Sequence, residues 1–392
     1  MKKARLGFIG VGKFIRENHL LTARDSDRMT IRAIADINES LLDQIVSRME
    51  VEYTTTNYKD ILADPSVDIV VIGTKQDLHA RLIVESLRAG KWVFCEKPMS
   101  ETEEETRLIL ETEKKSSGRL AIGFNRRFAP AYVQARRLMS DVKKPWNIYY
   151  RLAWPNQPQY EKFYHDTNRP HLLYEGCHVL DLVCWFLNSR PERVYMTGGE
   201  LNDHCAILSF PDESQAMIIC GSLNSRCLWK EYIEVLGEHH AITVSDFVDM
   251  RVRGFPGEFD RLFPPYRNEK GEQVLKYGFD FFEEYIAKRN MEDIDLPPEM
   301  PMEKVLRPIS HDYDTWSYNH DNPDIWTCIG DKGWVQSFEH FVQCFLDGTN
   351  PKNANATAGA LVTELAHAMF ESRQTGQPVE MEPYYTHIRQ TV

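Results

Sequence analysis

Residues 7–15 read GFIGVGKFI, and this short stretch decides the fold of the first part of the chain. It lies at the end of an apolar run over about 5–11, which predicts a β-strand, and Gly10 and Gly12 break that run. A helix is expected to follow over about residues 13–24. A strand that enters a helix through a tight glycine turn is the first half of a βα unit.

The same alternation of strand and helix continues to about residue 125. Further strands are expected at TIRAIAD, VDIVVIGT, WVFCEKP and RLAIGFN, with helices at NESLLDQIVSRM, LHARLIVESLRAG and ETEEETRLILETEKKSSG. VDIVVIGT is a continuous β-branched run, as in a strand that is covered on both faces. Because the connections are only a few residues long, these units predict a parallel, doubly wound α/β sheet of the Rossmann type.

The pattern changes after about residue 125. Strands separated by turns are expected at NIYYRLAW, RVYMTGGE, HCAILSFP, AMIICGSL and EYIEVLGEHHAITVSDF, with helices at about 172–187, 335–347 and 357–373. Neighbouring strands with few crossovers indicate a C-terminal α+β domain with a large, mainly antiparallel open sheet. We therefore predict domains over 1–124 and 125–392. The second carries an aromatic-rich insert at about 255–326, for which a lid and an oligomer contact are both open.

Composition restricts the classes of function. The chain has 392 residues, enough for two domains, and its net charge of −12 argues against nucleic acid or an anionic membrane as partner. No apolar run reaches the ~20 residues that span a bilayer. The eight cysteines stand mostly in apolar stretches without the spacing of metal ligands. They indicate reduced thiols in a cytoplasmic protein and no metal site.

The glycine turn has the context of a dinucleotide-binding loop. Gly10 permits the tight turn, and Gly12 lets the main chain approach a pyrophosphate at the start of the helix, beside Lys13 and Phe14. Ile15 stands where the third glycine of G-x-G-x-x-G is usual. A G-x-G alone also occurs in plain strand–helix turns, so a second signal is needed.

Asp36 supplies that signal, because it ends the second strand 24 residues after Gly12. A carboxylate at this place accepts hydrogen bonds from the ribose hydroxyls of NAD and repels the 2′-phosphate of NADP. No arginine follows it directly. The cofactor predicted from these residues is NAD, with NADP less favoured.

Several motifs together resemble the Gfo/Idh/MocA oxidoreductase family, which is named for glucose–fructose oxidoreductase and inositol dehydrogenase. They are GFIGVG, AIAD, VIGTKQDLHARL, AGKWVFCEKPM and GFNRRF within roughly residues 4–130, followed by matches at 175–194 and 231–247. The resemblance implies a Rossmann domain and a second domain whose open sheet usually forms the dimer face. It also implies a sugar or cyclitol substrate and a homodimer or homotetramer.

The same resemblance assigns roles to residues around the E-K-P element. Lys97 is expected beside the nicotinamide and the substrate hydroxyl, where its cation stabilises a developing alkoxide and relays the proton, and Glu96 helps to hold it. The family places further cofactor contacts at Thr74, Gln76, His79 and Asn125. Lys75 replaces the usual proline and Gln76 the usual asparagine, and a purely structural role for His79 stays open.

A second group of residues follows from the family pattern D-x-G-x-H-x-x-D. Gly176, His178 and Asp181 match it, whereas Tyr174 stands at the position of the first aspartate. His178 is the predicted general base, since imidazole titrates near neutrality. Tyr174 is expected to bind substrate or donate a proton, and Asp181 either orients His178 or braces the helix. Further predicted substrate contacts are Arg127, which is otherwise a charged linker residue, Tyr164 and Asp166.

Three functions compete on these residues. The first is an NAD-dependent dehydrogenase that acts on a ring CH–OH group of a sugar, glycoside or inositol. The second is a redox-neutral enzyme that uses bound NAD for a transient oxidation during glycoside elimination or hydrolysis. The third is a non-catalytic NAD-binding sensor, which needs neither Lys97 nor His178 and is therefore disfavoured.

Overall fold

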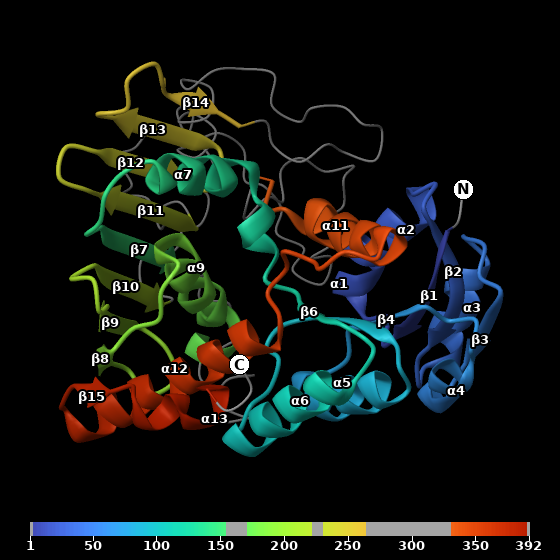
Figure 1. The fold of residues 1–392 in the computed structure, drawn as a ribbon. Helices are drawn as coiled ribbons and strands as arrows, with labels where there is room; N and C mark the ends of the chain where they lie inside the picture. Colours follow the sequence, from blue (N-terminus) through green and yellow to red (C-terminus); the bar gives the residue numbers. More distant parts are fainter. Residues whose placement is uncertain (1–2, 154–170, 222–229, 264–330, 390–392) are drawn as a thin grey trace, which may run out of the picture. The chain divides into compact units, whose positions relative to one another are not determined.

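The structure is a computed structural model and describes residues 3–153, 171–221, 230–263 and 331–389 (Figure 1). The chain divides into two compact units. The first comprises Met1–Phe128, Gly333–Ala368 and Met381–Val392, and the second comprises Ala129–Lys332 and Met369–Glu380. No helix among the described residues is long and apolar enough to cross a membrane.

The first unit contains a six-stranded parallel sheet with the order β3-β2-β1-β4-β5-β6. Its strands are β1 (Ala4–Ile9), β2 (Met29–Ala35), β3 (Tyr53–Thr55), β4 (Ile69–Ile72), β5 (Trp92–Cys95) and β6 (Leu120–Ile122). From β1 the chain adds β2 and β3 on one side of the sheet and then β4, β5 and β6 on the other. The strand order thus reverses between β1 and β4, as in a doubly wound sheet. The predicted Rossmann architecture is confirmed.

The helices of this unit follow the predicted alternation. They are α1 (Lys13–Ile15), α2 (Leu21–Asp25), α3 (Glu39–Val46), α4 (Tyr58–Ala63), α5 (His79–Arg88) and α6 (Glu103–Lys115). One feature was not predicted: a π-helical turn, η1 (Arg16–Leu20), separates α1 from α2. Such a turn holds one residue more than an α-helical turn and changes the direction of the side chains that follow.

A distant segment completes the core of the first unit. Helix α11 (Trp334–Asp347) lies on the same face of the sheet as α2, and α5 and α6 lie on the other (Figure 1). Its Phe338 and Phe341 are fully buried against the sheet residues Phe8 and Phe94. The sequence division at residue 124 placed α11 in the second domain, whereas its contacts assign it to the first unit. The reason is that apolar spacing predicts a helix but does not identify its partner.

The second unit contains a nine-stranded sheet with the order β14-β13-β12-β11-β7-β10-β9-β8-β15. Its strands are β7 (Asn147–Ala153), β8 (Arg193–Gly198), β9 (His204–Ser209), β10 (Gln215–Gly221), β11 (Glu231–Leu236), β12 (Ala241–Ser245), β13 (Asp249–Arg253), β14 (Arg261–Leu262) and β15 (Val379–Glu380). Only β7 and β10 pair in parallel, which confirms the mainly antiparallel sheet.

Helices cover one face of this sheet. They include α7 (Pro130–Ser140), which contacts β12, and α9 (Cys177–Leu187), which contacts β7 (Figure 1). Burial alternates along β8 and β10, so every second side chain faces away from these helices. Helix α12 (Ala356–Thr375) begins in the first unit and ends in the second. Most of the predicted insert, residues 264–326, lies outside the described residues.

Candidate active site

The glycine turn after β1 has the backbone geometry that the sequence predicts. Gly10 has φ +78°, and a Cβ there would lie 2.7 Å from Thr74 Cγ2, so both conformation and space require glycine. A Cβ at Gly12 would meet nothing within 4 Å. The main chain at Gly12 is therefore open to an approaching phosphate group, just before α1 begins at Lys13. Burial lowers the pKa of the Lys13 amine.

Ile15, at the place of the usual third glycine, is accommodated by a glycine elsewhere. Its side chain is 2% exposed and packs over Gly73, where a Cβ would lie 2.0 Å from Ile15 Cγ1. Gly73 directly follows β4. The close approach between helix and sheet is thus kept, with the glycine on the strand side of the contact.

Asp36 is held next to the glycine turn. Its Oδ2 accepts a hydrogen bond from the Val11 N–H at 2.9 Å, and its Oδ1 accepts one from the Asn38 N–H at 3.0 Å. The Gly10 N–H donates to Ala35 O at 2.8 Å and joins the ends of β1 and β2. These bonds bring together the two signals that the sequence places 24 residues apart.

His79 joins the loops that follow β4 and β5. It is 1% exposed, with Nδ1 2.7 Å from Pro98 O and Nε2 3.3 Å from Thr74 O. Burial lowers the pKa of the ring, which favours the neutral form. The shorter distance assigns its proton to Nδ1, which donates to Pro98. His79 therefore fixes the main chain directly after Lys97, and a direct cofactor contact by His79 stays a prediction.

Glu96 lies in a largely buried position beside Lys97. Its Oε1 is 2.7 Å from Nε2 of His19, a residue of η1 that sequence reasoning missed. Its N–H donates to Ile72 O at 3.0 Å and extends the β4–β5 pairing by one residue. Lys97 is half-buried. Neither apolar spacing nor the E-K-P motif points to His19, because the pairing depends on how η1 is placed over the sheet.

The other predicted cofactor residues of the first unit lie at the same end of the sheet. Thr74 and Gln76 follow β4, with Gln76 at the start of η2 (Gln76–Leu78). Asn125 is 3% exposed and begins η3 (Asn125–Phe128), which also contains Arg127. Carboxyl ends of parallel strands share one edge. The cofactor residues predicted in this unit therefore all lie at the carboxyl-terminal edge of the parallel sheet, which is the usual place of ligand sites in doubly wound sheets.

In the second unit, the predicted catalytic residues lie on one helical segment against the nine-stranded sheet. Tyr174 belongs to a π-helical turn, η4 (Leu172–Gly176), and His178 to the first turn of α9. Tyr174, His178 and Asp181 are 5%, 4% and 2% exposed. At Gly176 a Cβ would lie 3.0 Å from Cys220 Sγ, so glycine is needed for the close approach to β10.

Charged groups are also buried near this segment. Lys230 donates to Glu175 at 3.0 Å, and the two side chains are 7% and 12% exposed. Glu231, which is fully buried, accepts a hydrogen bond from Tyr150 at 2.7 Å and pairs with Lys332 at 3.5 Å. Buried charges persist only when paired, so these contacts stabilise the start of β11 beneath the helices. The predicted substrate residues Tyr164 and Asp166 lie outside the described residues.

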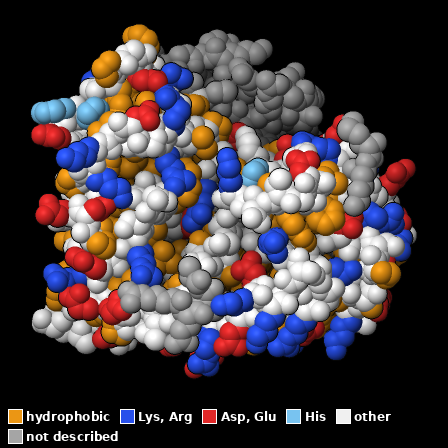
Figure 2. Space-filling view, viewed as in Figure 1, with side chains coloured by type: hydrophobic (Ala, Val, Ile, Leu, Met, Phe, Trp, Pro, Cys, Tyr) orange, Lys and Arg blue, Asp and Glu red, His pale blue; other side chains and the backbone are white. Residues whose placement is uncertain are grey.

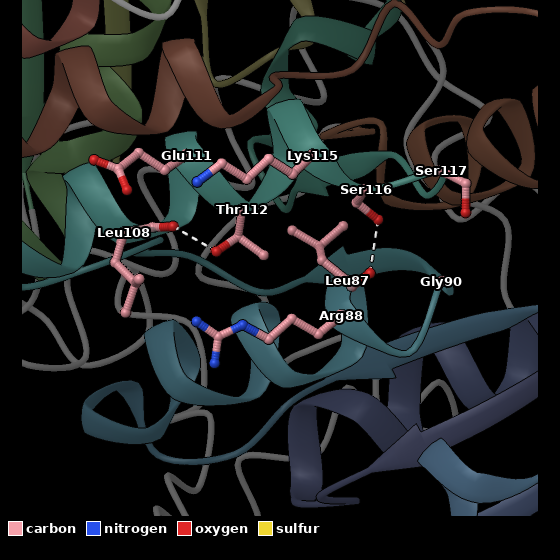
Figure 3. Close-up of a pocket in the computed structure, with 9 residues that line it drawn as sticks. All are labelled: Leu87, Arg88, Gly90, Leu108, Glu111, Thr112, Lys115, Ser116 and Ser117. Atoms are coloured by element: carbon pink, nitrogen blue, oxygen red, sulfur yellow. Dashed lines mark hydrogen bonds between the residues drawn. The ribbon is translucent and has the colours of Figure 1, made fainter.

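A surface pocket of about 370 Å³ lies between α5 and α6 and is a separate feature (Figure 3). Its lining includes Arg88, Leu108 and Lys115, and none of the predicted site residues takes part. Basic and acidic side chains are mixed over the surface of these helices (Figure 2). Within the described ranges, no group of three or more His, Cys, Asp or Glu side chains is placed to hold a metal ion.

Comparison with known proteins gives matches over both units. Residues 4–124 match the family model described as "Oxidoreductase family, NAD-binding Rossmann fold", the Gfo/Idh/MocA family. The uncharacterised oxidoreductase YrbE of Bacillus subtilis is 29% identical over 71% of this chain and 86% of its own length. An inositol 2-dehydrogenase/D-chiro-inositol 3-dehydrogenase of Lactiplantibacillus plantarum is 28% identical over 55% of this chain and 61% of its own, so that match spans only part of the relative.

Solved structures share this fold. The scyllo-inositol dehydrogenase of Lactobacillus casei, solved with NAD(H) and scyllo-inositol, superimposes with a TM-score of 0.71 over 97% of this chain and 99% of its own, at 17% identity. An aldose-aldose oxidoreductase of Caulobacter crescentus gives a TM-score of 0.70 over 97% and 100%, also at 17% identity. At this identity the likeness concerns the fold. The family match over residues 4–124 shows that this part of the chain resembles the Gfo/Idh/MocA oxidoreductases, as the sequence predicts, and it indicates an oxidoreductase with NAD as its cofactor.

Proposed function

We propose that this enzyme is a dehydrogenase that transfers a hydride from a ring CH–OH group of a cyclitol or sugar to NAD. The observation that carries the proposal is the shared edge of the first unit, where the glycine turn, Asp36 and the E-K-P element lie together. The relative from Lactiplantibacillus plantarum and the solved enzyme from Lactobacillus casei, both inositol dehydrogenases by name, support a cyclitol as the first choice.

The residues divide the chemistry between them. NAD, when bound, supplies the hydride acceptor. His178 accepts the proton of the substrate hydroxyl, and the Lys97 ammonium stabilises the negative charge that develops on that oxygen. Tyr174 hydrogen-bonds the substrate, and further substrate contacts are assigned to Arg127, Tyr164 and Asp166. In the first unit, Glu96, His79 and the loop after β5 keep Lys97 in place.

Asp36 is proposed to select NAD over NADP. Within the part of the chain that the structure describes, the Val11 and Asn38 N–H groups use two oxygen lone pairs of the carboxylate, which keeps the capacity to accept from ribose hydroxyls. The next residue, Ile37, is 93% exposed and offers no cation to a 2′-phosphate. Both features favour an unphosphorylated ribose.

Replacing Asp36 by alanine is expected to raise the Kd for NAD and to reduce the preference over NADP. Hydrogen bonds to a charged group contribute about 1.5–3 kcal/mol, which corresponds to a tenfold or larger loss. Isothermal titration with NAD and NADP measures both effects. Asp43→Ala, on the exposed side of α3, is the matched control. An unchanged ratio of the two Kd values in Asp36→Ala would show that Asp36 does not contact the ribose.

The face of the nine-stranded sheet that no described helix covers is proposed as the contact between subunits of a homodimer or homotetramer. Tyr195, Ile207, Met217 and Ile219 are 37%, 41%, 46% and 38% exposed. Ile207 pairs with Tyr195 on one side and with Met217 on the other, so three of them form one row across β8, β9 and β10. Contiguous exposed apolar groups of this kind mark interaction surfaces.

The double variant Ile207→Glu/Met217→Glu is expected to be a monomer, because two carboxylates without partners would be buried in the contact. Light scattering coupled to gel filtration measures the mass. Leu108→Glu changes a residue of α6 that is 43% exposed and is the matched control. A wild-type monomer, or an oligomer that survives the double variant, would contradict the assignment of this face.

The proposed activity is tested by a screen of inositol isomers and sugars with NAD, in which product and NADH are both measured. Equal amounts of the two are expected with at least one cyclitol or sugar. Product without NADH would favour the redox-neutral alternative. Neither product nor NADH with any ring alcohol, in protein that binds NAD, would contradict the proposal.

A further inference from the structure

Glu96 and His19 form a buried pair directly beside Lys97. The side chains of His19 and Glu96 are 2% and 12% exposed, and His19 Nε2 lies 2.7 Å from Glu96 Oε1. A carboxylate accepts hydrogen bonds, so the imidazole N–H is the donor. The pair connects the π-helical turn η1 with the residue that follows β5.

The rest of the His19 ring is surrounded by aromatic side chains. The ring centroids of Phe14, Phe94 and Phe338 lie 5.7, 5.1 and 5.0 Å from that of His19. Its Nδ1 is buried and has no hydrogen-bond partner among the described residues. A proton on Nδ1 would be a buried donor without an acceptor, which is unfavourable, so the proton lies on Nε2 and points at Glu96. Among the described residues, the ring therefore binds Glu96 and has no second hydrogen-bond partner to which it passes a proton.

The Glu96 carboxylate also lies close to a glycine that leaves room for it. At Gly123, which directly follows β6, a Cβ would lie 2.8 Å from both Oε1 and Oε2. The Lys97 N–H donates to Glu96 Oε2 at 3.4 Å. The carboxylate is thus confined between His19, Gly123 and the main chain of Lys97, so its position is coupled to that of the lysine.

We infer that His19 is a positioning residue for the E-K-P element. It fixes Glu96, and through Glu96 it sets the main chain and the charge next to Lys97. The π-helical turn presents the ring: Asn18, in the same turn, donates from Nδ2 to Phe14 O of α1 at 3.0 Å, and π turns are frequent at functional sites. The expected changes in kcat rest on the proposed function. The expected change in the reactivity of the Lys97 amine does not.

Two substitutions separate positioning from packing. His19→Leu keeps an apolar side chain among the aromatic rings but removes the hydrogen-bond donor to Glu96. His19→Gln keeps a donor, because its amide N–H lies near the place of Nε2. Because small displacements of a reacting group cost up to about 100-fold, His19→Leu is expected to lower kcat about 10- to 100-fold. The Kd for NADH and the KM should change little, and His19→Gln should restore most of kcat. Phe338→Leu, which changes the aromatic surroundings alone, should lower Tm and leave kcat as in the wild type.

Two further variants test whether His19 acts through Glu96. Adding His19→Leu to Glu96→Gln should cause no further loss of kcat, because residues that act as one unit are not additive. Gly123→Ala should displace the carboxylate while His19 is intact and lower kcat as His19→Leu does. If His19→Leu does not fold, His19→Gln and Gly123→Ala keep the inference testable. The inference would be overturned if the losses of kcat from His19→Leu and Glu96→Gln multiplied in the double variant. A wild-type kcat in Gly123→Ala would also overturn it.

A chemical readout keeps this test independent of the substrate. Reductive methylation with formaldehyde, followed by peptide mass spectrometry, reports the reactivity of the Lys97 amine. The rate at Lys97 should change in His19→Leu and return in His19→Gln, while the rate at the exposed Lys59 stays constant. An unchanged Lys97 rate in His19→Leu would overturn the inference even where no substrate is found. If the Lys97 methylation rates change as expected but no substrate is found, the proposed function would be overturned and the inference about His19 would stand.

Discussion

Replacing Lys97 by alanine is expected to abolish measurable turnover while NAD still binds. The loss should be about 10²- to 10⁴-fold in kcat, the range of a proton-transferring group, because the cation that stabilises the alkoxide is gone. The contacts at Gly12 and Asp36 lie at other strand ends and do not involve the lysine. Steady-state kinetics with the best cyclitol, together with the Kd for NADH, measures the two effects separately.

Lys97→Met is the companion variant, because it keeps the aliphatic stem and removes only the charge. It should behave as Lys97→Ala does. Lys59→Ala, on the exposed surface of α4, is the matched control and should leave kcat unaltered. Turnover of Lys97→Ala within a few-fold of the wild type would remove the lysine from the mechanism.

Replacing His178 by asparagine is expected to have the second-largest effect, again about 10²- to 10⁴-fold in kcat. As the general base, the imidazole must be unprotonated, so wild-type activity should rise with pH at the acidic end of the profile. That rise should be absent in His178→Asn. Since His178 lies buried at the start of α9, the far-UV spectrum and Tm must be measured alongside the pH profile.

His239→Asn is the control for this substitution, because His239 is highly exposed. It should retain both the rate and the pH profile. A His178→Asn variant that is folded, slow and still has the wild-type acidic limb would show that another group is the base.

Local sequence patterns predict most of the fold because local interactions determine it. The β-branched run at residues 67–74 is a central strand, β4, since only a strand covered on both faces is apolar throughout. The glycine turn before residue 13 predicts the strand–helix junction for the same reason: Gly10 needs a positive φ that other residues rarely adopt.

The structural features that the sequence does not predict depend on contacts between segments that are far apart in the chain. The apolar face of α11 predicts burial but not that it packs on β1 and β5, far away in the chain. Gly73 makes room for Ile15 across two elements, which no motif records. His19 likewise pairs with Glu96 only because the π turn places its ring over β5.

The central claim is that a hydride moves from a ring carbon to NAD, and isotope transfer tests it most directly. The enzyme is mixed with NAD and a cyclitol that carries deuterium at its ring CH–OH carbons. Mass spectrometry of the NADH then shows whether that deuterium has arrived. The account predicts one deuterium in each NADH, formed together with one ketone product and with a slower rate than for the unlabelled cyclitol. Product without labelled NADH would contradict the account.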